Sequence, residues 1–371
     1  MTWTTRITGF ILILAFGFLA AVYMRYYVHP KEHAIILFIA PAVSPELFSK
    51  ATQDNPLSSQ KLYSLFNQST IITSHLTDYQ KSSPRELLSS LASGQLIPPG
   101  QVGYNEQNKT VDTLLYSAQR KARTVGIITT TNFGSAGASA FYTHTYEPDD
   151  LYQNTLQAFD NTRINVLLSA GIALPKPSQP MSEEEVRTVI NDAKSMGYRI
   201  ANDQKSLFEI PNWSSRLIFG AFGKNSLLYH PRIKRLEPST IRTVSLASLA
   251  QRAILALQYN IRGYFLVVDD QSILYSKYAK SKNMTTQYTQ DLLNSIHTAK
   301  DYAGDNLILC LYIPYQLATN PTANATQIEY DSLNQITDHS HGLFFMHSRK
   351  KIVLPAFSTL QEIYEILNDE L

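Results

Sequence analysis

The sequence of 371 residues contains a single cysteine, Cys310, and little charge. One cysteine cannot form an internal disulfide or supply a cysteine-based zinc cluster, so both kinds of stabilisation are excluded. Lys and Arg total 32 against 30 Asp and Glu, and charged residues make up 17% of the chain. Such a near-neutral chain has no charge excess with which to bind nucleic acid, and we predict no nucleic-acid partner. P-loop, G-x-G-x-x-G and C-x-x-C motifs are also absent from the sequence.

Hydrophobic residues, by contrast, make up 44% of the chain, which excludes disorder as its main state. They are concentrated at residues 7–24, an 18-residue stretch without charge between Arg6 and Arg25. About 20 apolar residues cross a bilayer core, so this stretch predicts an uncleaved signal-anchor that forms a transmembrane helix. A cleaved signal peptide and a buried helix are the alternatives. We therefore expect an N-terminal membrane segment, 1–31, and a body, 32–371, on the non-cytoplasmic (periplasmic or extracellular) side.

The body alternates short apolar runs with segments of helical periodicity. Uninterrupted apolar runs are typical of strands buried on both faces. They occur at 34–39, 124–129, 164–168, 216–222, 264–268 and 306–311. Helices are predicted between them at 111–122, 182–196, 244–258, 286–302 and 358–367. This alternation predicts one α/β domain whose mainly parallel sheet has helices on both faces.

The stretch TVGIITTTNFGSAGASAFYTHT at 124–145 is similar to one in the alkaline phosphatases. In that family, a strand reading VGIVTTT leads through a loop to a helix ending PAAFAAH. Further segments resemble the family in the family's own order. They lie at 34–43, 164–171, 197–198, 217–222, 238–268 and 304–309. The resemblance, over most of 34–371, implies the alkaline phosphatase fold. It also implies hydrolysis of phosphate monoesters with paired zinc ions, a magnesium ion, a serine nucleophile and an arginine that holds the phosphate.

Most positions at which the resemblance places catalytic residues carry unsuitable side chains here. The family's nucleophile falls near Ser82, Ser83 and Pro84. The metal and phosphate positions are occupied by Pro41, Ser135, Gly137, Pro148, Asp269, Leu274, Tyr278, Ile313 and Pro314. Among these, the proline residues replace a metal-bridging aspartate, the phosphate-binding arginine and a histidine ligand. Since proline, leucine and isoleucine side chains have no ligand atom, the resemblance implies a retained scaffold with most of the catalytic residues replaced.

One loop near the C-terminus, TDHSHGL, concentrates side chains that can bind a metal ion. Asp338, His339 and His341, together with Asp269, form a candidate vestigial metal site. The family's final histidine ligand falls on Ser340, between the two histidines. A solvated loop and a complete catalytic site are the alternatives.

Two further features allow a structural as well as a functional interpretation. Asp269 and Asp270 directly follow an apolar run, where α/β proteins often place functional acids, but they could equally start a helix or lie in a loop. His144 matches a family position, and we predict that it is a structural cap or a partly buried histidine.

Three functional hypotheses follow from these residues. The first is a membrane-tethered pseudo-phosphatase without catalytic metals that is used for binding or assembly. The second is a divergent, active phosphomonoesterase or phosphodiesterase that uses zinc or magnesium. The third is a structural envelope protein whose tyrosine-rich surface packs against a partner. Under all three we expect membrane contact through residues 7–24, while a protein partner and a homodimer are left open.

Overall fold

The computed structural model describes most of the body and one N-terminal helix, and structural statements refer to these residues. They are residues 3–23, 34–43, 66, 68–72, 84–160, 163–171, 181–212, 217–222, 244–278, 281–313, 342–349, 352, 354–355 and 357–371.

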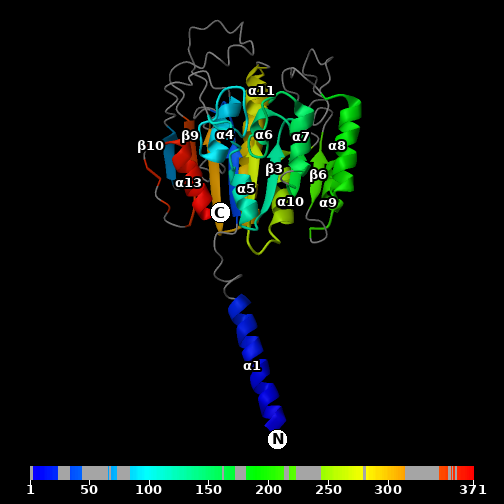
Figure 1. The fold of residues 1–371 in the computed structure, drawn as a ribbon, viewed down its shortest axis with the longest axis vertical. Coiled ribbons are helices and arrows are strands. Elements are labelled where there is room, and N and C mark those ends of the chain that lie inside the picture. The colour runs from blue at the N-terminus through cyan, green and yellow to red at the C-terminus, as the bar shows by residue number, and fades with distance from the viewer. Residues whose placement is uncertain are drawn as a thin grey trace.

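A ten-stranded sheet forms the centre of the body, in the order β10-β2-β9-β8-β1-β7-β3-β4-β6-β5 (Figure 1). The strands are β1 Ala34–Ile39, β2 Gln68–Ile72, β3 Thr124–Thr129, β4 Val166–Ser169, β5 Arg199–Ala201, β6 Ile218–Ala221, β7 Tyr264–Asp269, β8 Leu307–Ile313, β9 Gly342–His347 and β10 Phe357–Ser358. All neighbouring strands pair in parallel except β9, which is antiparallel to β2 and β8. The predicted, mainly parallel sheet is thus confirmed, while the edge formed by β2, β9 and β10 was not predicted.

Helices cover both faces of the sheet, as predicted (Figure 1). They are α1 Trp3–Tyr23, α4 Pro84–Ser93, α5 Leu114–Arg120, α6 Ala136–Ser139, α7 Leu151–Asp160, α8 Glu183–Ser195, α9 Gln204–Glu209, α10 Leu246–Leu257, α11 Ser272–Tyr278, α12 Lys282–Ala303 and α13 Leu360–Glu370. In β1, Ile36 and Phe38 pack with α10 and α12, whereas Ile35 and Leu37 pack with α4, α5 and α13. Alternate residues of one strand therefore enter two separate cores, which explains why the strand is apolar throughout.

Helix caps agree with the sequence in one case and correct it in another. Ser182 begins α8 in the predicted capping box, with its Oγ accepting a hydrogen bond from Glu185 N at 3.2 Å. Helix α13 begins later than predicted, because Ser358 is the last residue of β10 and the capping box is formed by Thr359 and Glu362.

The N-terminal apolar segment forms helix α1, which Figure 1 shows apart from the α/β body. Its described apolar side chains are exposed, for example Phe10 at 63% and Phe16 at 76%. Within the described residues, no helix is both long and apolar enough to cross a membrane, so the predicted transmembrane helix over 7–24 is not supported. A span needs about 20 consecutive apolar residues, and the side chains described in α1 are those of Ile7 and of residues 9–20.

Candidate functional site

The candidate site lies where three neighbouring parallel strands end. The last residue of β7, Asp269, is in register with Ile39 at the end of β1 and with Thr129 at the end of β3. The carboxyl edge of an open parallel sheet is where α/β proteins bind ligands. Asp269 therefore occupies the position from which a functional carboxylate would act.

Both carboxylate oxygens of Asp269 are held by protein donors. Thr129 Oγ1 donates to Oδ2 at 3.0 Å, and Gln271 Nε2 donates to Oδ1 at 2.5 Å. The side chain is completely buried, and this burial raises the pKa of Asp269 to about 7 despite the two hydrogen bonds, which lower it. Loss of hydration penalises the charged form of a carboxyl group, so Asp269 is close to half protonated at neutral pH.

Helix α6 closes directly over this carboxylate. A Cβ atom added to Gly137 would lie 2.2 Å from Asp269 Oδ2, which is far inside van der Waals contact. Glycine is thus the residue that lets the α6 backbone approach Asp269. Gly137 stands at one of the metal or phosphate positions that the resemblance implies, and there the α6 backbone lies directly against Asp269.

A chain of hydroxyl groups occupies the loop between β3 and α6. Thr131 Oγ1 lies 3.0 Å from Thr129 Oγ1 and 2.5 Å from Ser135 Oγ. Ser135 Oγ in turn donates to the carbonyl oxygen of Asn132 at 2.5 Å, and Ser169 Oγ donates to that of Thr131. Ser135 stands at a metal-ligand position of the family, but its hydroxyl is used to fix the loop.

Asp270 helps to begin the next helix. Its Oδ1 accepts hydrogen bonds from Ser272 N at 3.1 Å and from Ser272 Oγ at 2.5 Å, at the first residue of α11. A side-chain oxygen that accepts from the first turn stabilises a helix start. The structural interpretation of Asp270 is therefore confirmed, and the two adjacent aspartates have separate partners.

The remaining positions implied by the resemblance add no ligand within the described residues. Pro41 lies in the turn after β1, Leu274 is buried on α11 and Ile313 ends β8. Tyr278 is the last residue of α11. Pro84 begins α4. The other predicted positions lie outside the described residues: Ser82, Ser83, Pro314, Asp338, His339, Ser340 and His341.

This donor set does not fit the zinc and magnesium ions that the resemblance implies. In the described part of the chain, no three His, Cys, Asp or Glu side chains come together as a metal site. Structural zinc takes four ligands and catalytic zinc three protein ligands. This strand end offers two adjacent buried carboxylates: Asp269, bonded by Thr129 and Gln271, and Asp270, bonded by Ser272.

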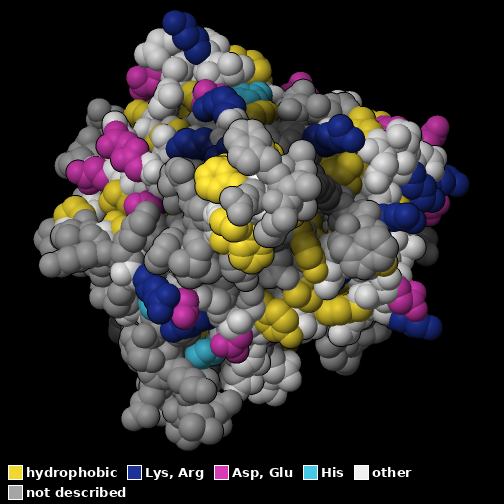
Figure 2. All heavy atoms as spheres, turned by 90° about the horizontal axis from the view of Figure 1, so that it is seen from below, with side chains coloured by type: hydrophobic (Ala, Val, Ile, Leu, Met, Phe, Trp, Pro, Cys, Tyr) yellow, Lys and Arg dark blue, Asp and Glu magenta, His cyan; other side chains and the backbone are white. Residues whose placement is uncertain are grey.

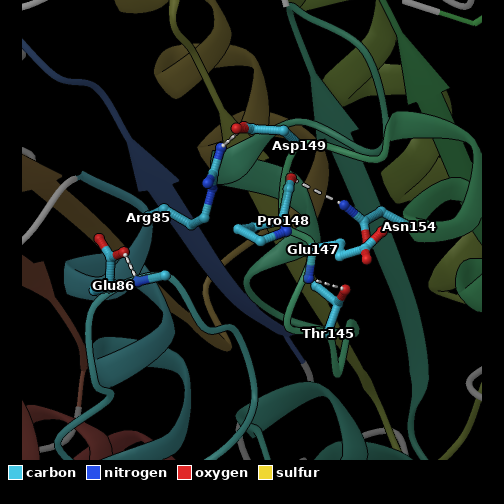
Figure 3. Close-up of polar contacts among 8 residues, drawn as sticks. Arg85, Glu86, Thr145, Glu147, Pro148, Asp149 and Asn154 are labelled. Carbon is cyan, nitrogen blue, oxygen red and sulfur yellow. Dashed lines mark hydrogen bonds and ion pairs between the residues drawn. The ribbon is translucent and has the colours of Figure 1, made fainter. Parts of the chain in front are cut away.

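An arginine lies close to the family's phosphate-binding position, but it comes from another element. Arg85, in the first turn of α4, donates from a terminal guanidinium nitrogen to Asp149 Oδ1 at 2.6 Å (Figure 3). Asp149 directly follows Pro148, whose carbonyl oxygen accepts a hydrogen bond from Asn154 Nδ2 at 3.0 Å. The Arg85 side chain is 18% exposed and that of Asp149 is 59% exposed. Sequence reasoning missed this pair, although Arg85 follows the expected nucleophile position immediately.

His144 has the structural role that was predicted for it. Its Nε2 lies 3.0 Å from the carbonyl oxygen of Val111, and its backbone N–H donates to Gln157 Oε1 at 2.9 Å. The ring contacts Tyr104 edge-on, at a centroid distance of 5.9 Å. These contacts connect the loop before α7 to the segment before α5 that contains Tyr104 and Val111.

A polar cavity of about 430 Å³ lies elsewhere, between α4, α5 and α13. Its wall includes Arg120 and Asp112, which form an ion pair at 2.7 Å, and Tyr364. None of the Asp269 network lines it, so the cavity is separate from the strand ends.

The sequence model of the family Alkaline phosphatase matches residues 97–311, more than half of the chain. The chain belongs to the alkaline phosphatase family. A curated relative, the alkaline phosphatase of Escherichia coli (strain K12), is 23% identical over 300 residues, which cover 71% of this chain and 63% of that protein. The match thus spans less than two thirds of that relative's length.

Solved structures of this family share the fold. Alkaline phosphatase from the Antarctic bacterium TAB5 superimposes with a TM-score of 0.65 at 13% identity, covering 91% of this chain and 97% of that one. The cold-active alkaline phosphatase from a psychrophilic Shewanella sp. gives a TM-score of 0.66 at 13% identity, covering 91% and 99%. At this identity the likeness shows the fold alone.

Proposed function

We propose that this member of the alkaline phosphatase family does not hydrolyse phosphate esters by a two-metal mechanism and acts in binding or assembly. The observation that supports the proposal most strongly is the closure of the carboxyl edge around Asp269. Thr129 and Gln271 donate to its two oxygens, and the α6 backbone at Gly137 packs against it. A carboxylate that binds a metal ion needs room for the ion at its oxygens and further ligands beside it. A Cβ atom on Gly137 would lie 2.2 Å from Oδ2 and 2.3 Å from Oδ1, so α6 takes up this room, and the described residues place no further ligand group there.

The proposal includes attachment of the protein to a membrane, on the non-cytoplasmic side. Support comes from α1, whose described apolar side chains are exposed to solvent in the isolated chain. Exposed apolar surface of this extent is stabilised by transfer into lipid. A protein partner or a second copy would then meet the body at the membrane.

A divergent metal-dependent phosphatase is the second candidate. It is favoured by the place of Asp269, at the end of a central strand and at a metal-ligand position of the family. In this candidate, Asp338, His339 and His341 would complete the metal site together with Asp269. The third hypothesis, a structural envelope protein, differs from the binding function only in the partner that the tyrosine-rich surface would contact.

The full-length chain, purified in detergent and supplied with zinc and magnesium, tests the proposal. Metal content is measured by mass spectrometry, and turnover is measured with an aryl phosphate, beside the variant Asp269→Ala. We expect substoichiometric zinc and no hydrolysis above that of buffer in either protein. Stoichiometric zinc, with turnover that is lost in Asp269→Ala, would overturn the proposal in favour of the divergent phosphatase.

A further inference from the structure

The connection from α1 enters the sheet at its centre, on the edge formed by the amino ends of the parallel strands (the amino edge). Ala34, the first residue of β1, is in register with Tyr264 at the start of β7 and with Leu307 at the start of β8. Eleven residue steps separate Tyr23, the end of α1, from Ala34. An extended chain of this length spans at most about 40 Å. The amino ends of β1, β7 and β8 are therefore held within this distance of whatever surface α1 binds.

Exposed apolar side chains flank this entry point on both sides. Tyr259 (56% exposed) and Ile261 (59%) lie in the turn that leads into β7, and Tyr302 (41%) lies in the last turn of α12, which leads into β8. We name these three residues the amino-edge patch. Outside α1, six large hydrophobic side chains of the described residues are exposed, and the patch supplies half of them.

Hydrogen bonds hold the patch in this outward arrangement. Asn260 Nδ2 donates to the carbonyl oxygen of Ala122 at 2.8 Å, and Asn260 Oδ1 accepts from Arg262 N at 2.9 Å. The neighbours of Asn260 in sequence, Tyr259 and Ile261, thus project from a fixed turn. Gln251 Nε2 donates to the Tyr302 hydroxyl at 2.5 Å, which satisfies the polar end of that ring while leaving its face exposed.

Resting on the membrane attachment proposed above, we infer that the amino-edge patch contacts the lipid interface of the membrane that α1 binds. Tyrosine is favoured at the boundary of headgroups and acyl chains, because its ring is apolar and its hydroxyl polar. Ile261 would enter the acyl region beside it. The patch lies at the amino ends of the strands and Asp269 at the carboxyl end of β7. This orientation therefore directs Asp269 and the Arg85–Asp149 pair away from the membrane.

The proposed contact between the amino-edge patch and the lipid does not depend on charge. Figure 2, which views the molecule from the side of α1, shows Lys and Arg interspersed with Asp and Glu around the rim. One such pair at this edge is Arg349 with Asp305, whose charged groups lie 3.3 Å apart. A mixed rim has little net attraction for anionic lipid, so we expect contact with zwitterionic and anionic vesicles alike.

A fluorescent label at Ile261 tests the inference in the full-length chain. Ile261→Cys is labelled with nitrobenzoxadiazole, and Gln153→Cys, on the exposed face of α7 near the carboxyl edge, is the matched control. The native Cys310 is completely buried, and burial raises the pKa of its thiol, so it does not compete for the label. Both proteins are bound to phosphatidylcholine vesicles with and without spin-labelled lipid.

We expect the label at position 261 to be quenched several-fold more strongly than the label at 153. Equal, weak quenching at both positions in protein that floats with the vesicles would overturn the inference and leave the membrane attachment standing. Protein that does not float with vesicles would overturn both. If the label at position 261 is not quenched, and unlabelled Ile261→Cys instead forms a crosslink between two chains at this position, the patch binds a second copy and the inference is overturned.

Discussion

The interior of the central strands and their carboxyl ends differ sharply in what they retain. Within the sheet, β1, β3 and β7 are apolar, buried and aligned residue for residue. At their last residues the strands differ in character: β7 ends in Asp269 and β3 in Thr129, whereas β1 ends in Ile39 and continues into Ala40 and Pro41. The interior contributes most to stability, because it lies between two apolar cores, while the ends are held by hydrogen bonds and by the packing of α6.

Under the function proposed above, the fold is kept although its catalytic positions are replaced, because the polar groups at these positions find partners within the protein. Around Asp269 the hydroxyl of Thr129, the amide of Gln271 and the backbone at Gly137 do this. Buried polar groups without partners would destabilise the edge, and here each Asp269 oxygen has a donor. Variants in the two regions should therefore differ in the size and in the kind of their effects.

The largest effect is expected inside the sheet. Phe265→Ala, in β7, removes a completely buried ring and should lower the free energy of unfolding by about 3–5 kcal/mol. The exposed control Gln287→Ala, on α12, should change it by less than about 0.5 kcal/mol. Urea denaturation of the two proteins checks this. Equal effects of the two substitutions would show that β7 is not part of the stable core.

The next effect is the pH dependence that Asp269 gives to the stability of the fold. Its folded pKa is about 7, above the usual value of about 3.9 in an unfolded chain. The folded state therefore binds more protons between about pH 4 and 7, and its stability should fall as pH rises through this window, by up to about 1.4 kcal/mol per unit. Asp269→Asn should remove this slope in denaturation experiments at several pH values. A slope of the opposite sign would mean that the carboxylate is stabilised in its charged form, as a bound metal ion would do.

Closure of α6 over Asp269 is tested by adding one methyl group. Gly137→Ala places its Cβ 2.2 Å from Asp269 Oδ2 and should destabilise the fold by about 1–3 kcal/mol. In Asp269→Ala the opposing carboxylate is absent, so the same substitution should cost less there. The difference between the two costs is the coupling energy of a double-mutant cycle. Zero coupling would mean that α6 and Asp269 do not touch.

The smallest effect is expected at the exposed ion pair. Asp149→Asn removes the charge opposite Arg85, and because Asp149 is 59% exposed, solvent screens the interaction to about 0.2–1 kcal/mol. The loss should shrink further at high salt. Thermal unfolding at two salt concentrations measures it, with Asp301→Asn at an exposed position of α12 as the control. A larger, salt-independent loss would show that the pair is part of the buried framework.

Periodicity predicted the sheet well where strands are buried on both faces. The runs that became β1, β3 and β7 have no polar residue to interrupt them, and the capping box at Ser182 placed the start of α8. Strands β2 and β9 were missed, because β2 begins with the polar residues Gln68, Ser69 and Thr70 and the apolar stretch of β9, 343–346, is only four residues long. A capped helix was expected to start at Ser358, but this residue belongs to β10 and pairs with Ile72 of β2.

The site was predicted by resemblance at some positions only. Asp269 lies at a strand end, as the apolar run before it predicted, and its metal-binding role stays a prediction. Its partners Thr129 and Gln271 carry no signal in a single sequence. Arg85 was missed because the family supplies its arginine from the loop at Pro148, and only the folded chain brings the two together. A transmembrane helix was predicted from length and apolarity, and the described part of α1 does not support it.

Zinc titration of the full-length chain is the sharpest test of a carboxyl edge that is closed without a metal ion. Unfolding temperature is followed while zinc is added to the purified protein and to Asp269→Asn. A closed edge should give no saturable shift in either protein. A ligand at 100 times its dissociation constant stabilises a protein by about 2.7 kcal/mol, so a saturable rise in the natural protein that Asp269→Asn abolishes would show that the edge binds zinc.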